Sequence, residues 1–310
     1  MVQSIQQRTC HLLQQLARQE GYTESLLDSV RFMRADRRWA RTPVLYEPSI
    51  IIICQGAKRA FLADKTYRYD AQHYLVLSVP LPFAAETEAT SEEPLLGLAI
   101  RLDVNMVAGL VAKFASVQAE LPDAPASVLS TPIDASLAEC TLRLLESLSN
   151  PLEAKVLGAA RVEEICFRVL MGEQGGAVRA ALTYQGHFGR IARALQRIHS
   201  DWREPLDVSR LANEAGMSVP RFHLHFKNVT QTTPIQYLKS LRLHQARLMM
   251  IRDNLTAAAA AARVGYESDS HFNREFKRMF GRSPAEEARV MKQAFALLPP
   301  EQLLAQLPTH

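Results

Sequence analysis

The sequence has few of the residue clusters on which most enzymes and metal-binding proteins depend. Only two histidines, His11 and His73, precede residue 187. No Ser-His-Asp order, glycine-rich phosphate loop or acid–base pair stands out in the chain. A metal-binding barrel needs clustered histidine and carboxylate ligands, and a single strand histidine is typical of a hydrogen-bonded core residue. We therefore predict that the protein is not an enzyme and that it binds no metal and no cofactor.

Cysteines are also scarce and widely spaced. The four are Cys10, Cys54, Cys140 and Cys166, and no Cys-x-x-Cys pair occurs. This spacing excludes a disulfide framework and a zinc ribbon. We expect four reduced thiols, most of them buried. A redox or electrophile sensor is the alternative for these residues, and it requires an exposed thiol of low pKa.

Long apolar stretches are absent as well. The run Ile50–Cys54 is among the longest, and it is far too short to cross a bilayer. The first eight residues lack the apolar core of a signal peptide. With 47% hydrophobic and 22% charged residues, the composition is that of an ordinary globular protein. We therefore expect a cytoplasmic protein without a membrane partner.

The charge is distributed unevenly along the chain. Residues 187–295 contain 18 Lys and Arg against 10 Asp and Glu, an excess of eight positive charges. The net charge of the whole chain is +4, so the remainder carries a net charge of −4. A basic C-terminal third beside a mildly acidic remainder favours a polyanionic partner for the C-terminal part.

That basic region contains one motif twice, at an offset of 50 residues. The aligned pairs are Phe222 and Phe272, Phe226 and Phe276, Lys227 and Lys277, and Pro234 and Pro284. Each copy reads as a helix, a glycine turn at Gly216 or Gly265, and a second helix. N-cap candidates stand before the helices at Asp207, Thr256 and Ser268, and Gly281 ends the last one. This is the build of a helix-turn-helix, whose second helix enters the DNA major groove.

We place the DNA-binding domain at 190–295, with helix-turn-helix units at 207–229 and 256–280. Its first helix is expected at 188–200, and a last short helix begins at Pro284. A long helix, 234–250, connects the two units. For both second helices to enter one face of B-DNA, this connector has to hold them about 34 Å apart.

The N-terminal part reads as a small β structure followed by helices. The β texture covers about 43–103, with a hairpin around 63–66, a chain break at Pro80 and Pro82, and a last strand at 95–102. We expect a helix at 26–32, another at 104–118, and a loop from Pro122 to Pro132. Several short strands at close spacing predict a small antiparallel barrel or a double-sheet roll. Such a barrel can hold one small ligand.

Two long amphipathic helices, 135–148 and 152–171, follow the barrel. Their apolar positions have helical spacing, and the expected set comprises Leu137, Cys140, Leu144, Leu145, Leu148, Val156, Leu157, Ala160, Ile165 and Val169. We expect one face to pack on the barrel and the other to form a homodimer interface across 134–171. The regulatory and dimerisation domain is thus 1–172, and 173–189 is the linker, with helix expected around 178–182.

The C-terminal motifs resemble those of the AraC/XylS family of bacterial transcriptional regulators over about 187–292. The resemblance is carried by Leu211-Ala212-x-x-Ala215-Gly216-Met217-Ser218, Phe222-His223-x-x-Phe226-Lys227, and the stretch Arg263–Pro284. The N-terminal part is similar to the regulatory domain of one branch of the family, through Tyr46-Glu47-Pro48-Ser49, Cys54-Gln55-Gly56-Ala57-Lys58 and 170–175.

The resemblance implies an α+β protein with two domains. The N-terminal domain would be a cupin-like antiparallel β-barrel with flanking helices, and the C-terminal domain an all-α, homeodomain-like double helix-turn-helix. The implied function is that of a sequence-specific transcription factor. Its partners would be double-stranded DNA, a small-molecule or stress effector of unknown identity and, for an activator, RNA polymerase.

The family reads DNA with the exposed faces of the two second helices. The matching positions are Pro220, His223, Leu224 and Lys227, then Ser268, Asp269, Ser270, Asn273, Arg274, Lys277 and Arg282. Arg274 is the best candidate for a bidentate guanine contact. Lys227, Lys277 and Arg282 would contact phosphates, which position the protein without specifying sequence. We expect the four phenylalanines of the repeat to be core residues.

Three features depart from the family pattern. Leu224 stands where relatives often carry arginine, so the first reading helix has less polar readout, and an apolar contact with a thymine methyl is its alternative role. Asp269 either accepts from a cytosine amino group or caps its helix. The alanine run 257–262 supports a helix but supplies few DNA contacts.

Two other functions compete with the effector-controlled regulator. One is a fusion of the same DNA-binding domain to an alkyl-transfer DNA repair enzyme, whose zinc-activated cysteine cluster the scattered cysteines argue against. The other is an effector-independent DNA-binding protein. The interior of the barrel discriminates here, since an apolar pocket with a few polar groups favours an effector and a filled core does not.

Overall fold

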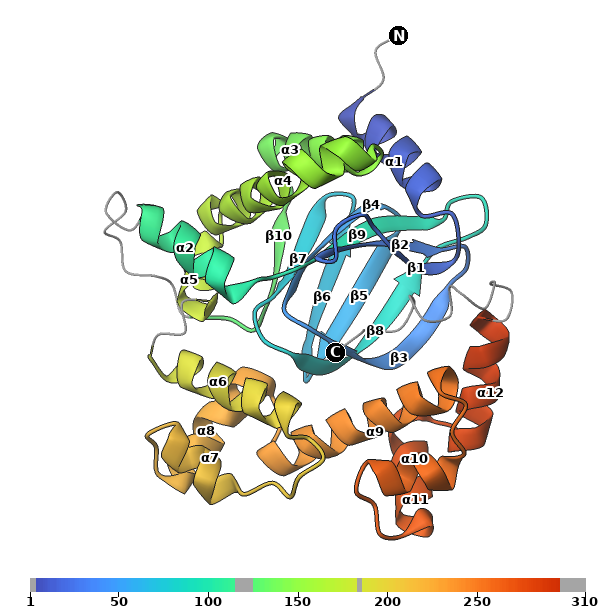
Figure 1. The fold of residues 1–310 in the computed structure, drawn as a ribbon, viewed down its shortest axis with the longest axis vertical. Coiled ribbons are helices and arrows are strands. Elements are labelled where there is room, and N and C mark those ends of the chain that lie inside the picture. The colour runs from blue at the N-terminus through green and yellow to red at the C-terminus, as the bar shows by residue number, and fades with distance from the viewer. Residues whose placement is uncertain (1–3, 115–124, 183–185, 296–310) are drawn as a thin grey trace. The chain divides into compact units, whose positions relative to one another are not determined.

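The computed structural model describes residues 4–114, 125–182 and 186–295. The chain divides into two compact units. The first comprises most of the chain up to Gly189, and the second begins at Arg190 and includes the short segments 42–45 and 81–84. Strands belong to the N-terminal half and helices make up the C-terminal part (Figure 1). No helix among the described residues is long and apolar enough to cross a membrane.

The strands form one antiparallel sheet with the order β1-β2-β9-β4-β7-β6-β5-β8-β3, and β10 pairs with β7. Their bounds are β1 Gly21–Glu24, β2 Val30–Ala35, β3 Trp39–Tyr46, β4 Ser49–Gln55, β5 Ala57–Leu62, β6 Lys65–Asp70, β7 His73–Leu77, β8 Leu81–Glu88, β9 Leu95–Arg101 and β10 Val128–Pro132. The sheet curls into an antiparallel half-barrel, as the sequence predicted.

Helices cover one face of this sheet (Figure 1). They are α1 Ile5–Leu16, α2 Val104–Phe114, α3 Ala135–Leu148, α4 Pro151–Met171 and α5 Gly175–Leu182. The β-branched run of β4 explains the arrangement, because successive side chains of a strand point to opposite faces. Ile50 and Ile52 pack in one core cluster with Leu144 of α3 and Ile165 of α4. Ile51 and Ile53 are equally buried and point to the other, concave face.

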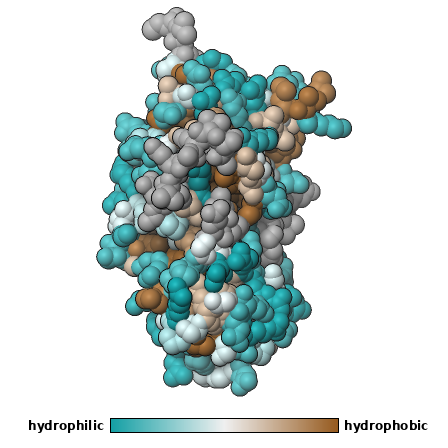
Figure 2. Space-filling model, turned by 90° about the vertical axis from the view of Figure 1, so that its left-hand side faces the viewer, coloured by the Kyte–Doolittle hydropathy of each residue, from teal (hydrophilic) through white to brown (hydrophobic). Residues whose placement is uncertain are grey.

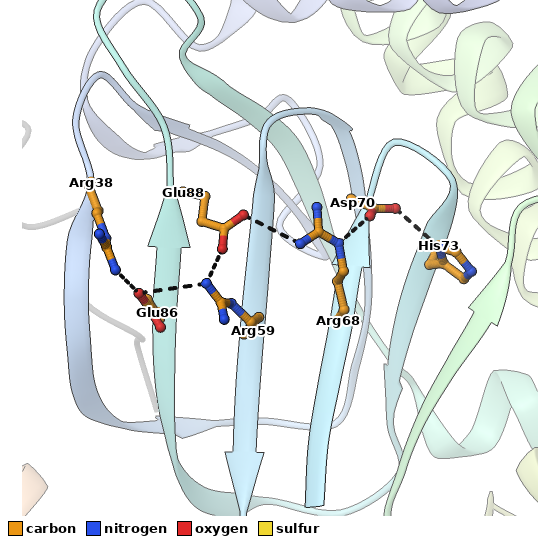
Figure 3. Close-up of polar contacts among 7 residues, drawn as sticks. All are labelled: Arg38, Arg59, Arg68, Asp70, His73, Glu86 and Glu88. Carbon is orange, nitrogen blue, oxygen red and sulfur yellow. Dashed lines mark hydrogen bonds and ion pairs between the residues drawn. The ribbon is translucent and has the colours of Figure 1, made fainter.

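The outer face of the remaining strands carries a row of ion pairs (Figure 3). Arg59 and Arg68 are direct cross-strand partners on β5 and β6, and like charges placed opposite each other destabilise a sheet. Glu88 of β8 accepts from both arginines and offsets this repulsion. The row continues to Arg38 through Glu86 on one side, and to His73 through Asp70 on the other.

Several strand predictions were wrong. The segment 26–32, predicted to be helical, contains the start of β2, which pairs with β9 and buries Val30 and Phe32. The sheet therefore begins at residue 21, not 43. The expected loop at 122–132 ends in β10, which pairs with β7. Short apolar runs fit strand and helix equally well, and only a pairing partner far along the chain decides between them.

Prolines and one turn were also misread. Pro82 does not break the chain but is the second residue of β8, whereas Pro80 lies between β7 and β8. The hairpin turn is tighter than predicted, because Leu62 pairs with Lys65 and only two residues lie between them. Of the expected helix at 104–118, residues 104–114 are helical, and the rest lies outside the described residues.

Helices α3 and α4 occur as predicted, but the buried face of α4 differs. Val156, Leu157 and Ala160 of the predicted apolar set are exposed, the first two to 67% and 38%, whereas Ile165 and Val169 of the same set are buried. The buried face instead contains small residues such as Ala154 and Gly158. A Cβ at Gly158 would lie 2.8 Å from the Leu27 side chain, so the helix approaches its neighbour too closely for a larger residue. The predicted apolar set consisted mainly of bulky residues, so the buried face of small residues was not predicted.

The predicted linker is structured over much of its length. α5 occupies 175–182, and its Val178 and Leu182 side chains are buried in the core of the first unit. A Cβ at Gly175 would lie 2.1 Å from the Leu170 carbonyl oxygen, which explains why glycine begins this helix.

Apart from the segments 42–45 and 81–84, the described residues of the second unit form helices at nearly the predicted positions. They are α6 Gly186–Ser200, α7 Val208–Glu214, α8 Val219–Thr230, α9 Pro234–Arg252, α10 Ala257–Arg263, α11 Asp269–Phe280 and α12 Pro284–Phe295. Figure 1 shows α9 running as one uninterrupted helix between the α7–α8 pair and the α10–α11 pair. The predicted rigid connector is therefore present.

Candidate nucleic-acid interface

A side-chain N-cap begins the first helix of each helix-turn-helix. The Asp207 carboxylate accepts from the Arg210 N–H at 3.0 Å and caps α7. The Thr256 hydroxyl does the same for the Ala259 N–H at 3.1 Å and caps α10. Such caps satisfy N–H groups that have no partner inside the helix. Both predicted N-caps are confirmed.

The two turns share one geometry. Gly216 and Gly265 have φ angles of 60° and 82°, which glycine adopts without a steric penalty. The N–H that follows each glycine donates to a carbonyl five residues back, in Ala212 or Ala261. The second turn is one residue longer, so the offset between the copies changes from 49 at the glycines to 50 in the following helices.

An arginine beside each turn was missed at the sequence level. The Arg190 guanidinium of α6 donates to the Gly216 carbonyl at 3.2 Å. A Cβ at Gly265 would lie 3.3 Å from Arg242 of α9, which donates to the Trp202 carbonyl at 2.9 Å. Both arginines therefore stiffen the unit rather than face solvent. Each arginine lies in the helix that precedes its turn, and nothing in the sequence pattern there predicts the contact with the turn.

The apolar faces of α8 and α11 form the core, as predicted. Phe222 and Phe226 are completely buried. Their counterparts Phe272 and Phe276 are at most 1% exposed. Their rings pack with centroids 5.6 Å apart in α8 and 5.4 Å apart in α11. This packing fixes which face each helix turns outward.

The outward face of α11 is polar and unpaired. Five predicted site residues on it are exposed and make no side-chain hydrogen bond or ion pair with other described residues: Asp269, Ser270, Asn273, Arg274 and Lys277. The Ser268 hydroxyl accepts from the His271 N–H at 3.3 Å and is the N-cap. Capping as the role of Asp269 is therefore wrong, which leaves its carboxylate available to a partner.

The outward face of α8 is less polar. Pro220, Leu224 and Lys227 are exposed, Leu224 to 59%, whereas His223 is half-buried. Ser218 is the N-cap residue but makes no capping hydrogen bond with its side chain. The structure thus brings the predicted residues of each helix onto one face, and the richer set of donors and acceptors lies on α11.

Glu275 links the underside of α11 to its surroundings and was not predicted. Its buried carboxylate accepts from Arg278 at 2.8 Å, lies 3.4 Å from the Lys239 ammonium of α9, and accepts from the Tyr266 hydroxyl at 3.3 Å. Burial acts to raise the pKa of Glu275, but Lys239 and Arg278 outweigh it and hold the pKa below its usual value. The ionised carboxylate therefore orients α11.

Arg282 is placed differently from the other predicted phosphate contacts. It is exposed, yet its guanidinium lies 3.4 Å from the buried carboxylate of Glu287. A role with phosphate would compete with this internal pair. Lys227 and Lys277 have no such partner among the described residues.

The described part of the chain offers little to a metal ion. It contains no group of three or more His, Cys, Asp and Glu placed to hold one. The Nδ1 atom of His73 lies 3.1 Å from a carboxylate oxygen of Asp70. All four cysteines are free, three of them buried, and burial raises the pKa of Cys166 to about 12.

Comparison with known proteins finds two family models in the chain. The model described as the AraC-type transcriptional regulator N-terminus matches residues 26–177, and a helix-turn-helix domain model matches residues 211–289. The virulence regulon transcriptional activator VirF of Yersinia enterocolitica is 23% identical over 250 residues, which cover 79% of this chain and 90% of VirF. The regulator AlkR of Acinetobacter baylyi is 34% identical over 94 residues, 30% of this chain and 31% of AlkR.

A solved structure has the same two-domain fold. It is that of unsaturated fatty acid bound, wild-type ToxT from Vibrio cholerae, with a TM-score of 0.58 and 13% identity, covering 87% of this chain and 97% of ToxT. The family models, the relatives and the double helix-turn-helix agree. The chain therefore belongs to the AraC family of DNA-binding transcription regulators.

Proposed function

We propose that the protein reads DNA sequence with the outward faces of α8 and α11, and that α11 carries most of the specificity. The unpaired polar face of α11 is the observation that supports this. Asn273 offers a donor and an acceptor, and Arg274 offers a fork of donors for a guanine edge. Leu224 reduces the polar readout of α8, whose contribution is then shape and an apolar contact.

Arg274→Ala tests this assignment. DNA sites selected by the wild-type chain from a random library serve as the specific probe, and shuffled DNA as the non-specific one. Loss of a bidentate base contact costs about 1–3 kcal/mol, so we expect roughly 10- to 100-fold weaker binding to the selected sites. Binding to shuffled DNA should change little, as measured by fluorescence anisotropy at fixed salt.

Lys277→Ala is the matched control, because it removes a neighbouring exposed cation from the same helix. A phosphate contact positions without specifying, so this variant should weaken both probes alike and lower the salt dependence. Equal losses on both probes for Arg274→Ala would assign Arg274 to phosphate as well, and the base-reading role would be abandoned.

We further propose that the first unit controls DNA reading in response to a small molecule. A half-barrel of antiparallel strands is suited to hold one small ligand. The ToxT structure of the same fold is that of a fatty-acid-bound protein, which supports a ligand-responsive role here. We assign regulation to 1–172 and reading to 190–295, with α5 completing the regulatory part. An effector-independent protein is the outcome if no small molecule alters DNA binding.

The exposed side of α4 supports the homodimer proposed for helices 134–171. Leu152 and Val156, one turn apart on this helix, are 71% and 67% exposed. Figure 2 shows a mostly hydrophilic surface on which hydrophobic side chains stand out in a few places. Exposed apolar patches mark interaction sites, and a second copy of the chain would bury the same patch twice around a two-fold axis.

Val156→Lys is expected to convert a dimer to a monomer, because a buried unpaired ammonium is costly at an apolar interface. Analytical ultracentrifugation across a concentration series measures the change. Lys155→Ala, at the exposed neighbouring position, should leave the association unchanged. A wild-type chain that stays monomeric at high concentration, or an unaltered dimer with lysine at 156, would rule out this face.

A further inference from the structure

The concave side of the half-barrel holds a cluster of one lysine and three tyrosines from four strands. We call it the lysine–tyrosine cluster: Lys58 of β5, Tyr22 of β1, Tyr46 of β3 and Tyr69 of β6. Tyr22 and Tyr46 come from the two end strands of the sheet, and their hydroxyl oxygens are 3.4 Å apart. The two ends of the sheet therefore converge at this cluster.

The cluster contains a buried cation without an anion. Lys58 is only 9% exposed, and its ammonium donates to the Tyr46 hydroxyl at 3.1 Å. No carboxylate among the described residues forms an ion pair with it. A buried charge is costly unless it is paired. An anion bound beside Lys58 would therefore be stabilised by its positive charge.

The contrast with the adjacent residue is direct. Arg59 points to the outer face, where Glu88 accepts from it and the Glu86 carboxylate lies 4.0 Å from its guanidinium (Figure 3). Arg31, whose charge acts on Tyr22, is paired with Glu24 at 2.9 Å. Arg31 and Arg59 thus each have a carboxylate partner, whereas Lys58 has none among the described residues.

Hydrogen-bond donors also exceed acceptors here. The Lys58 ammonium has three N–H donors, of which one is accounted for. Tyr69 is fully buried beside Tyr46, and its hydroxyl makes no hydrogen bond of good geometry with described residues. Burial raises the pKa of Tyr22, Tyr46 and Tyr69, so each keeps its proton and none supplies a phenolate.

The surroundings of the cluster are apolar. Tyr22 pairs with Met33, and the same cross-strand row continues through Gly97 to Ile53. Met33 and Ile53 are buried to at least 97%. Tyr22 and Tyr46 are half-buried, so part of the cluster reaches the surface, whereas Lys58 and Tyr69 are buried. A single cation matches a single negative charge, which favours a carboxylate over a doubly charged phosphate.

We propose that the lysine–tyrosine cluster seats the carboxylate of the small-molecule signal, and that this signal is a monocarboxylate with an apolar body. Lys58 supplies the positive charge, and the tyrosine hydroxyls supply further donors. The inference rests on the proposed control by the first unit and adds the chemical class of the ligand and the residue that selects it.

Calorimetric titration of the full chain with decanoate and with 1-decanol tests the proposal. The two probes share an apolar body and differ in charge. The wild-type chain should bind decanoate at least about 10-fold more tightly than decanol. Lys58→Met should weaken decanoate binding about 10- to 100-fold, because a charge-assisted hydrogen bond is lost, and should leave decanol binding nearly unchanged. Lys58→Arg should retain much of the preference for decanoate.

Lys65→Met is the matched control, since Lys65 lies in the same hairpin and is exposed. Tyr46→Phe, which removes one hydroxyl and keeps the ring, should weaken decanoate binding less than Lys58→Met does. If Lys58→Met does not fold, the Tyr46→Phe titration and the comparison of decanoate with decanol on the wild-type chain still test the proposal. No decanoate binding by the wild-type chain, equal binding of decanol, sulfate binding as tight as decanoate, or equal effects of Lys58→Met and Lys65→Met would each overturn the proposal.

A DNA selection with Lys58→Met separates this inference from the proposed function. Recovery of the wild-type sites together with lost decanoate binding supports the carboxylate seat. If decanoate binds through Lys58 but leaves DNA binding unchanged, control by the first unit fails while the seat itself stands.

Discussion

Glu287→Ala should destabilise the second unit by about 3–5 kcal/mol, because it leaves a buried arginine without its counter-charge. The Arg247 and Glu287 side chains are 10% and 3% exposed, and their charged groups are 3.1 Å apart. Burial lowers the pKa of Arg247, and Glu287 opposes that shift. The loss is comparable to the whole stability of many domains, so DNA binding should fall with it.

Fluorescence measures this effect in one unit at a time. The chain has two tryptophans, Trp39 in the sheet and the buried Trp202 in the second unit. In a Trp39→Phe background, urea unfolding followed by Trp202 reports the second unit alone. Glu286→Ala is the matched control, because its side chain is exposed on the same turn of α12, and surface changes stay within about 0.5 kcal/mol.

A double replacement distinguishes a lost ion pair from a lost packing contact. With Arg247→Met and Glu287→Leu together, no unpaired charge remains buried, and most of the stability should return. A double variant as unstable as Glu287→Ala would show that the pair contributes through its packing. A loss of less than about 1 kcal/mol in Glu287→Ala would contradict the importance of the pair.

Acidification should destabilise the second unit through His244, by about 3 kcal/mol between about pH 7.5 and about pH 4.5. Burial, and then the nearby Arg247 charge, lower the pKa of His244 to about 3. The imidazole packs edge-on to the Phe280 ring, and its Nε2 atom has no partner among the described residues. Among the described residues, no carboxylate therefore compensates for a proton on this ring.

The sign of the effect follows from the two pKa values. The unfolded chain binds a proton at His244 below about pH 6.5, whereas the folded chain resists it down to about pH 3. Stability is therefore complete above about pH 6.5 and is lost progressively as the pH falls toward 3. Unfolding measured through Trp202 at several pH values tests this.

His244→Gln provides the comparison for the pH series, because glutamine does not titrate. The difference in unfolding free energy between wild type and His244→Gln should shift in favour of the variant by about 3 kcal/mol on acidification. The absolute stability of the variant does not affect the comparison, since only the change of the unfolding free energy with pH is used. A difference that stays constant over this range would place the ring in a solvated site.

Much of the second unit could be predicted because its signals are local. Caps at Asp207 and Thr256 lie three residues from the N–H groups they satisfy. The spacing of Phe272 and Phe276 fixes the buried face of α11 within one turn. Repetition at an offset of 50 strengthened each assignment, because both copies had to fit the same geometry.

The first unit and the charged interior depended on partners far along the chain. Residues 26–32 fit a helix and a strand equally well until β9, more than 60 residues later, supplied the pairing partner. The exposed side of α4 could not be predicted from the sequence, because small residues such as Gly158, not bulky ones, pack against the core. Spacing along a helix measures periodicity, whereas burial depends on what lies opposite.

The sequence by itself determined the double helix-turn-helix, its caps and turns, and the residues of its outward faces, since hydrogen bonds and side-chain contacts within a few residues decide these features. Only the tertiary structure decided that Lys58 points inward with no carboxylate partner among the described residues, while Arg59 points outward to two. It also decided that Glu287 neutralises Arg247. Alternation along a strand gives two faces, but which face closes over a core, and which charges then meet, depends on contacts between elements distant in the sequence.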